Sequence, residues 1–150
     1  MDYHDPHHDA SMNRPQIRTM LRQAGLRPTR QRLALAELLF AKGFRHLSAE
    51  NLHEEALMKR VPVSLATIYN TLNLLVAKGL LRQVALTEGR VVFDPNTSAH
   101  HHFIDDETGV ISDIPWDALE VSNVNQLEGF DVREYQVVLR GSQSKKKRRA

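Results

Sequence analysis

Apolar side chains recur at helical spacing through the first half of the chain. The first stripe stops before Gly25, whose freedom to adopt a positive φ suits the residue that follows a helix. Each later stripe follows a hydroxyl side chain that can cap a helix N-terminus: Thr29, Ser48 and Ser64. The pattern predicts four helices, of which the second ends near Gly43 and the fourth runs to about Lys78.

The second half of the chain changes to short runs rich in β-branched residues, which turn residues separate. These runs predict two hairpins, which join residues 80–86 to 91–94 and residues 101–105 to 110–114. After Pro115, residues 116–127 predict a helix and residues 132–139 predict a further strand.

Several short helices followed by a hairpin are typical of a winged helix-turn-helix domain. We therefore predict an α+β protein with an N-terminal winged helix-turn-helix DNA-binding domain and a small α+β dimerisation domain. The second domain has about 50 residues, which is close to the lower limit for independent stability, so pairing with a second copy would help it bury a core. The predicted boundaries are residues 1–12 for a disordered arm, 13–95 for the DNA-binding domain, 96–141 for the dimerisation domain and 142–150 for a basic tail.

The two halves carry opposite charge, which the formal net charge of +2 conceals. Residues 10–90 contain 13 lysine and arginine residues against 5 acidic residues, whereas residues 91–140 contain 2 against 10. A basic half attracts polyanions, and an acidic half that carries histidines suits a cation. The asymmetry indicates a different partner for each half, with double-stranded DNA as the partner of the first.

The composition excludes several classes of protein. The chain of 150 residues has no cysteine, and therefore no disulfide, thiolate zinc site or cysteine nucleophile. No apolar run approaches the roughly 18 residues of a membrane helix, and the N-terminus lacks the hydrophobic core of a signal peptide. We therefore expect a cytoplasmic protein with no membrane partner.

The predicted fourth helix has one buried face and one polar face. Its apolar positions fall at i, i+4, i+7 and i+8: Ile68, Leu72, Leu75 and Val76. Thr67 and Asn70 project from roughly the opposite side, with Tyr69 at the flank, and such groups can contact base edges in DNA. An ordinary amphipathic helix is the alternative. Three arginines that could contact phosphates favour DNA binding: Arg27, Arg30 and Arg32.

Three consecutive histidines, His100, His101 and His102, lie near the start of the acidic half. Near neutral pH, imidazoles can bind a transition metal or a haem iron. In a strand, His100 and His102 would share one face while His101 points to the other. The triplet therefore suggests a pair of ligands with a third histidine aimed elsewhere. A solvated histidine run in a loop is the alternative.

Four motifs in register resemble the ferric uptake regulator (Fur) superfamily. They are Arg27-Pro28-Thr29-Arg30-Gln31-Arg32, His46-Leu47-Ser48-Ala49-Glu50, Ala66-Thr67-Ile68-Tyr69-Asn70-Thr71-Leu72, and Val92-Phe93-Asp94 followed by the histidine triplet. The resemblance covers roughly residues 15–141. It implies a homodimer with an N-terminal winged helix, a C-terminal α+β dimerisation domain and a metal sensor at their junction.

The resemblance also implies a set of metal ligands. By motif position, the sensory site consists of His46, Asp94, His100, His102 and Asp113. Imidazole nitrogens with carboxylate oxygens suit Fe(II), Mn(II) or Zn(II) without a thiolate. His46 belongs to the basic half, so a cation that joins it to the other ligands would fix the angle between the domains. Alternatively, His46 caps or hydrogen bonds near the start of the helix at Ser48. A second site or a haem site would use His100, His101, His102 and Glu120, although Tyr135 stands where a further histidine ligand would be.

The chain departs from the pattern of many Fur relatives at two places, and these departures narrow the resemblance to one branch of the superfamily. Relatives with structural zinc carry a Cys-x-x-Cys after the histidine segment, where this chain has Asp105-Asp106-Glu107-Thr108-Gly109, so we expect no cysteine-ligated structural zinc. Asn70 stands where many relatives have arginine, which suggests a different operator. A cysteine-free chain with this histidine segment looks like the iron response regulator (Irr) branch, which senses iron status through haem and controls haem synthesis and iron homeostasis.

The expected function is that of a DNA-binding transcriptional regulator, mainly a repressor, and not that of an enzyme. Its partners would be an AT-rich operator and a second copy of the chain, with a metal ion or haem as the effector. Haem and a free divalent metal ion are both consistent with the histidine segment as the effector. The alternative is a histidine-based metal-storage protein or a metal-dependent hydrolase without DNA binding, although the short segments offer no obvious pocket.

Overall fold

The computed structural model describes residues 10–86 and 89–143. The described residues divide into two compact units, one within residues 10–97 and one within residues 98–143, and each is described by itself. The predicted arm and basic tail lie mainly outside the described residues. None of the described helices is long and apolar enough to cross a membrane.

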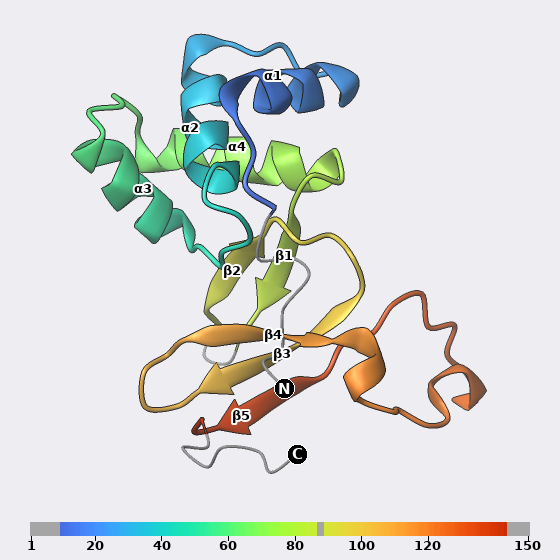
Figure 1. The fold of residues 1–150 in the computed structure, drawn as a ribbon. Coiled ribbons are helices and arrows are strands. Elements are labelled where there is room, and N and C mark those ends of the chain that lie inside the picture. Colours follow the sequence, from blue (N-terminus) through green and yellow to red (C-terminus); the bar gives the residue numbers. More distant parts are fainter. Residues whose placement is uncertain (1–9, 87–88, 144–150) are drawn as a thin grey trace. The chain divides into compact units, whose positions relative to one another are not determined.

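The N-terminal unit contains the four helices that the apolar pattern predicts (Figure 1). They are α1 (Arg14–Gln23), α2 (Arg30–Phe40), α3 (Ala49–Met58) and α4 (Leu65–Ala77). The three predicted hydroxyl caps are confirmed, because each side-chain oxygen accepts the backbone N–H three residues on, as Ser48 Oγ does from Asn51 at 3.0 Å. Gly25 adopts a φ of +77° just after α1, as expected.

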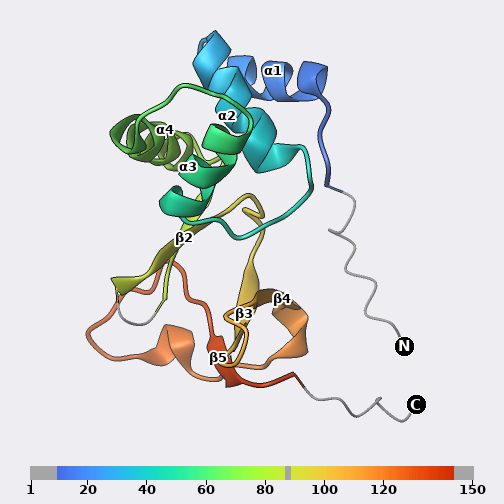
Figure 2. The same cartoon turned by 90° about the vertical axis from the view of Figure 1, so that its left-hand side faces the viewer.

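Helices α1 to α4 pack around one apolar core. Fully buried side chains come from all four helices and include Ile17, Leu35, Leu52 and Ile68. Figure 2 shows α3 and α4 side by side. Strands β1 (Arg82–Ala85) and β2 (Val91–Asp94) follow as the predicted antiparallel hairpin. The assignment of this unit as a DNA-binding winged helix stays a prediction.

Ser64 caps the helix that is predicted to contact DNA. Its Oγ accepts the backbone N–H of Thr67 at 3.1 Å and donates to Thr67 Oγ1 at 3.0 Å. Ser64→Ala is therefore expected to lower the free energy of unfolding by about 1 kcal/mol. Urea titration followed by circular dichroism measures this change, with Ser122→Ala in an exposed loop as the control. An unchanged unfolding midpoint would show that α4 does not depend on this cap.

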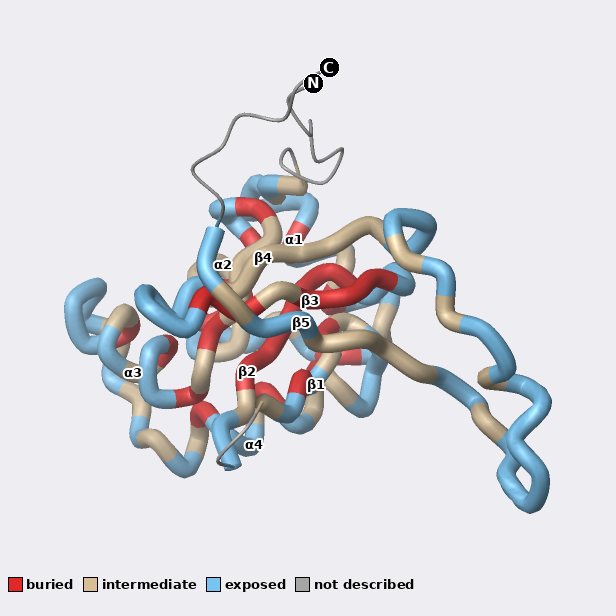
Figure 3. Tube along the Cα trace, turned by 90° about the horizontal axis from the view of Figure 1, so that it is seen from below, coloured by how far each residue is buried: buried red, intermediate tan, exposed pale blue. Residues whose placement is uncertain are grey.

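The C-terminal unit is built on a three-stranded sheet with the strand order β4–β3–β5. Strand β3 (His100–Asp105) pairs antiparallel with β4 (Ile111–Pro115) and parallel with β5 (Val138–Gly141). Figure 3 shows β3 as the buried strand between two more exposed neighbours. The second predicted hairpin is confirmed, and Gly109 takes a φ of +74° in its turn.

The predicted helix over residues 116–127 is wrong. Only two 3₁₀ turns form there, η2 (Trp116–Ala118) and η3 (Val124–Gln126), and Asn123 adopts a left-handed φ of +66°. Asparagine side chains compete for backbone hydrogen bonds and tolerate this φ, which interrupts a helix. The strand predicted over residues 132–139 is displaced, since β5 begins only at Val138 and the N–H of Val137 is donated to a side chain, His101 Nδ1.

Candidate metal centre and nucleic-acid interface

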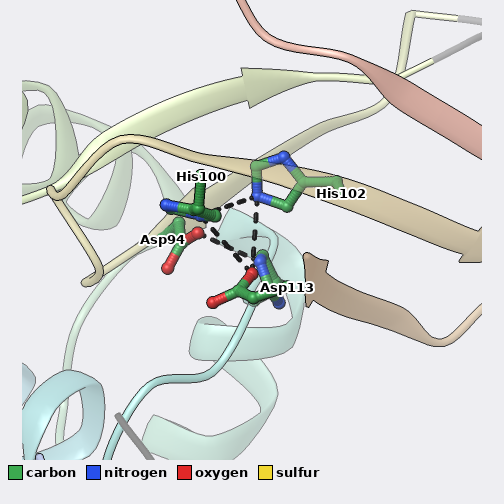
Figure 4. A group of neighbouring side chains, drawn as sticks. Asp94, His100, His102 and Asp113 are labelled. Atoms are coloured by element: carbon green, nitrogen blue, oxygen red, sulfur yellow. Dashed lines mark hydrogen bonds and ion pairs between the residues drawn. The ribbon is translucent and has the colours of Figure 1, made fainter. Parts of the chain in front are cut away.

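His100, His102 and Asp113 form a cluster within the C-terminal unit. Alternation along β3 puts both histidines on one face, and the antiparallel register sets Asp113 of β4 directly opposite His102. His100 Nε2 lies 3.0 Å from His102 Nε2 and 3.4 Å from Asp113 Oδ1, and His102 Nε2 lies 3.6 Å from the same oxygen. Figure 4 shows these three side chains pointing toward one another. The two strands thus bring two imidazoles and one carboxylate to a common point.

In both histidines of this cluster, the second ring nitrogen, Nδ1, forms a hydrogen bond with an acceptor oxygen. His100 Nδ1 donates to the carbonyl of Ser98 at 2.6 Å, and His102 Nδ1 donates to Gln136 Oε1 at 3.0 Å. A neutral imidazole has one N–H, so each Nε2 carries a lone pair. Two nitrogen lone pairs and a carboxylate oxygen within 3.6 Å repel one another unless a proton or a metal cation lies between them. The residues therefore fit a divalent metal ion, whose bonds to such atoms are roughly 2.0–2.2 Å long.

A second pair of candidate ligands lies in the N-terminal unit. Leu47 and Phe93 form an antiparallel bridge. Leu47 N donates to Phe93 O at 3.1 Å, and Phe93 N donates to Leu47 O at 2.7 Å. The bridge sets their sequence neighbours side by side, and His46 Nε2 lies 3.0 Å from Asp94 Oδ2. The other oxygen, Asp94 Oδ1, accepts the N–H of Asn96 at 2.9 Å, which orients the carboxylate. Each unit therefore carries its own group of candidate ligands.

His101 projects from the opposite face of β3, as the alternation predicts. Its ring stacks on Trp116, with centroids 4.6 Å apart and planes 17° apart, and its centroid lies 6.3 Å from that of Tyr135. His101 Nδ1 accepts the backbone N–H of Val137 at 2.9 Å. Burial lowers the pKa of His101 below its ordinary value, and the backbone of Trp116 opposes this shift. Glu120 is exposed after η2, and a second metal or haem site that uses it stays a prediction.

The exposed face of α4 carries the residues predicted to contact bases. Tyr69 and Asn70 are exposed, whereas Thr67 is half-buried and its hydroxyl accepts a hydrogen bond from Ser64 Oγ. Tyr69 Oη donates to Glu50 Oε1 on α3 at 2.6 Å. This hydrogen bond lowers the pKa of Glu50 and raises the pKa of Tyr69. The carboxylate therefore orients the phenol, and base contact by these side chains stays a prediction.

A cavity of about 680 Å³ lies among the N-terminus of α3, helix α4 and the β1–β2 hairpin. Its lining includes polar residues beyond those that the sequence predicts for this surface: Glu50, Asn51, Asn73 and Gln83. Asn73 follows Tyr69 by one helical turn, so spacing alone could have identified it. Glu50 and Gln83 belong to other elements, and only the fold brings them to the same cavity.

Of the three predicted phosphate-contacting arginines, Arg27 lies in the loop before α2, and Arg30 and Arg32 lie in its first turn. Arg27 and Arg30 are exposed. Arg32 is half-buried, and its Nη1 donates to the backbone carbonyl of Arg27 at 2.7 Å, so it also ties the preceding loop to the helix. Phosphate contact by all three stays a prediction.

The model of the Ferric uptake regulator family matches residues 23–140. The match spans most of the chain and includes every candidate metal ligand. The chain belongs to the ferric uptake regulator family. As a member of this family it is a metal-responsive regulator rather than an enzyme, and its α+β class agrees with the sequence prediction.

Known relatives of this family member support the same assignment. It is 33% identical to the Peroxide-responsive repressor PerR of Staphylococcus aureus strain Mu50 over 124 residues, which is 81% of this chain and 82% of the relative. The structure of the ferric uptake regulator from Pseudomonas aeruginosa with manganese matches with a TM-score of 0.65 at 28% identity, over 85% of this chain and 97% of that one. The Vibrio cholerae ferric uptake regulator, at 24% identity and a TM-score of 0.68 over 84% and 98% of the two chains, agrees in fold. The narrower assignment to the Irr branch stays a prediction.

Proposed function

We propose that the protein is a homodimeric, cytoplasmic transcriptional regulator whose affinity for a DNA operator depends on a bound divalent metal ion. The observation that carries this proposal is the convergence of His100 Nε2, His102 Nε2 and Asp113 Oδ1 within 3.6 Å. All three atoms are acceptors, and a cation stabilises such an arrangement. Membership of a family of regulators supports the DNA-binding role.

The proposed metal ligands come from both units: His46, Asp94, His100, His102 and Asp113. The C-terminal cluster offers three ligand atoms, and the His46–Asp94 pair offers two more. Fe(II), Mn(II) and Zn(II) all accept such nitrogen and oxygen ligands, and the relative from P. aeruginosa is described with manganese. A bound ion supplies the positive charge that these acceptors require. Ligands drawn from both units would make the orientation of the DNA-binding unit depend on metal occupancy.

The proposed DNA-binding surface is the exposed face of α4 together with the start of α2. Its base-contacting residues are Thr67, Tyr69 and Asn70, and its phosphate-contacting residues are Arg27, Arg30 and Arg32. In a homodimer, two such surfaces would contact half-sites about one helical turn apart. Leu127 and Phe130, which are 52% and 75% exposed, support pairing of the C-terminal unit with a second copy.

Operator binding by the apo, Mn(II)-, Fe(II)- and Zn(II)-loaded protein tests this function. Selection from a random AT-rich duplex library supplies the operator, and fluorescence anisotropy gives its affinity. At least one metal-loaded form is expected to bind the operator at least about fivefold more tightly than the apo form. Equal binding by every form would overturn metal sensing but not DNA binding. Metal binding without any selective DNA binding would favour the metal-storage alternative.

Arg30→Ala is expected to weaken binding to the operator and to unrelated DNA by the same factor. If Arg30 neutralises one phosphate, its loss lowers the slope of log affinity against log salt concentration by about 0.9. Titrations between low and moderate salt measure the slope, with Arg140→Ala on β5 as the control. A loss of affinity confined to one operator sequence would instead indicate that Arg30 contacts a base.

The cysteine-free histidine segment supports a narrower proposal, in which the protein belongs to the Irr branch and controls iron homeostasis and haem synthesis. A haem iron that takes an imidazole from His100 or His102 would compete with the divalent ion for the same side chains. Titration of haem into the Mn(II)-loaded protein should then release Mn(II), which electron paramagnetic resonance detects, and lower operator affinity. Stoichiometric Soret binding with no Mn(II) release and no loss of operator affinity would rule haem out as the signal.

A further inference from the structure

We propose that residues 135–137 give neighbouring histidines opposite roles. Gln136 positions His102 as a metal ligand, and the backbone N–H of Val137 keeps His101 from becoming one. This inference rests on the metal site proposed above and adds the residues that select its ligands from three consecutive histidines.

The backbone of Val137 fixes this segment against β3. His102 N donates to Val137 O at 3.0 Å, and Val137 N donates to His101 Nδ1 at 2.9 Å. Side chains in an extended segment alternate in direction. Accordingly, Tyr135 lies near the ring of His101, and Gln136 reaches His102 on the opposite face. The position of Gln136 is therefore set by backbone hydrogen bonds on its C-terminal side.

Gln136 orients the ring of His102. Its Oε1 accepts the Nδ1–H of His102 at 3.0 Å, which leaves the Nε2 lone pair on the side of Asp113 Oδ1, 3.6 Å away. For His100 a backbone group has the same role, because the carbonyl of Ser98 accepts its Nδ1–H at 2.6 Å. Ligating histidines commonly donate their second N–H to such an acceptor, and loss of the acceptor typically lowers metal affinity by about 10- to 100-fold. Gln136 is a positioning residue, because it acts on the metal through His102.

His101 is held in the opposite tautomer. Its Nδ1 accepts an amide hydrogen, so the neutral ring carries its proton on Nε2 and has no lone pair there for a metal. Nε2 is buried, and the ring stacks on Trp116. A bond from His101 to a metal would require the hydrogen bond from Val137 to break. Of the three consecutive histidines, only His100 and His102 thus have an Nε2 lone pair available for a metal.

Nuclear magnetic resonance of the ¹⁵N-labelled apo protein tests this arrangement without any metal. Long-range ¹H–¹⁵N correlations distinguish the two imidazole tautomers. We expect Nδ1–H for His100 and His102 and Nε2–H for His101. The Nε2–H tautomer at His102, or the Nδ1–H tautomer at His101, would overturn the proposal whether or not the protein binds metal.

Substitutions of Gln136 test its effect on affinity. Gln136→Leu removes the acceptor and is expected to weaken Mn(II) binding by about tenfold or more, while Gln136→Glu keeps an acceptor and retains the affinity. Gln126→Leu, on the exposed turn η3, is the matched control, and circular dichroism checks the fold of each variant. Wild-type Mn(II) affinity in a folded Gln136→Leu protein would overturn the role of Gln136. Absence of Mn(II) binding by the wild-type protein would overturn the proposed function instead, and the apo tautomers would still decide this inference.

Discussion

Replacing His102 with alanine is expected to lower the affinity for Mn(II) by at least about 100-fold. The change removes the Nε2 that lies 3.0 Å from His100 Nε2 and 3.6 Å from Asp113 Oδ1. Loss of a ligand should cost at least as much as loss of its hydrogen-bond partner, for which 10- to 100-fold is typical. Electron paramagnetic resonance of free Mn(II) measures the affinity, and anisotropy with labelled operator measures the consequence for DNA. The variant should bind the operator equally with and without Mn(II).

His53→Ala is the matched control for this prediction. His53 is half-buried on α3 and belongs to neither group of candidate ligands. Its replacement should leave Mn(II) affinity and metal-dependent operator binding at the wild-type level. Wild-type Mn(II) affinity in the His102→Ala protein would contradict the assignment of the cluster as a metal centre. Equal losses in both variants would instead indicate damage to the fold.

The helices of the N-terminal unit could be predicted because independent local signals agree there. At α3 and α4, for example, a hydroxyl cap comes just before an apolar stripe, and both helices begin directly after their caps, Ser48 and Ser64. Residues 116–127 have apolar residues at helical spacing but no hydroxyl cap at their start. Pro115, which precedes them, makes no capping hydrogen bond, and Asn123 turns left-handed. A single signal was insufficient there, because asparagine tolerates the left-handed conformation that interrupts a helix at Asn123.

The sequence predicted which residues could bind a metal, but not what orients them. Strand alternation separates His101 from His100 and His102, and the structure shows this separation. The acceptor for His102, however, is Gln136, which is 34 residues away. Glu50 and Tyr69 are likewise 19 residues apart. Contacts over such separations depend on how the elements pack, so no local pattern could indicate them.

Tyr69→Ala is expected to weaken operator binding on the order of 10- to 100-fold, with little effect on binding to unrelated DNA. Tyr69 lies on the exposed face of α4, and the change removes both its ring and its hydroxyl. The ring can pack against a thymine methyl group, and the hydroxyl can hydrogen bond to a base edge. Anisotropy titrations with operator and scrambled duplex measure both affinities. A uniform loss on both duplexes would show that Tyr69 contributes to general affinity rather than to sequence preference.

The hydrogen bond to Glu50 restricts which base edges the Tyr69 hydroxyl can contact. Because Tyr69 Oη donates to Glu50 Oε1 at 2.6 Å, its oxygen can only accept from a base, as from the amino group of adenine or cytosine. The lowered pKa of Glu50 keeps its carboxylate ionised across the neutral range, so this restriction persists there. Tyr69→Phe and Glu50→Ala should therefore both reduce discrimination at the same base pair, whereas Glu54→Ala, also exposed on α3, should not. Competition among operators with single base changes measures discrimination. Unaltered preference in both variants would show that the ring alone contacts the DNA.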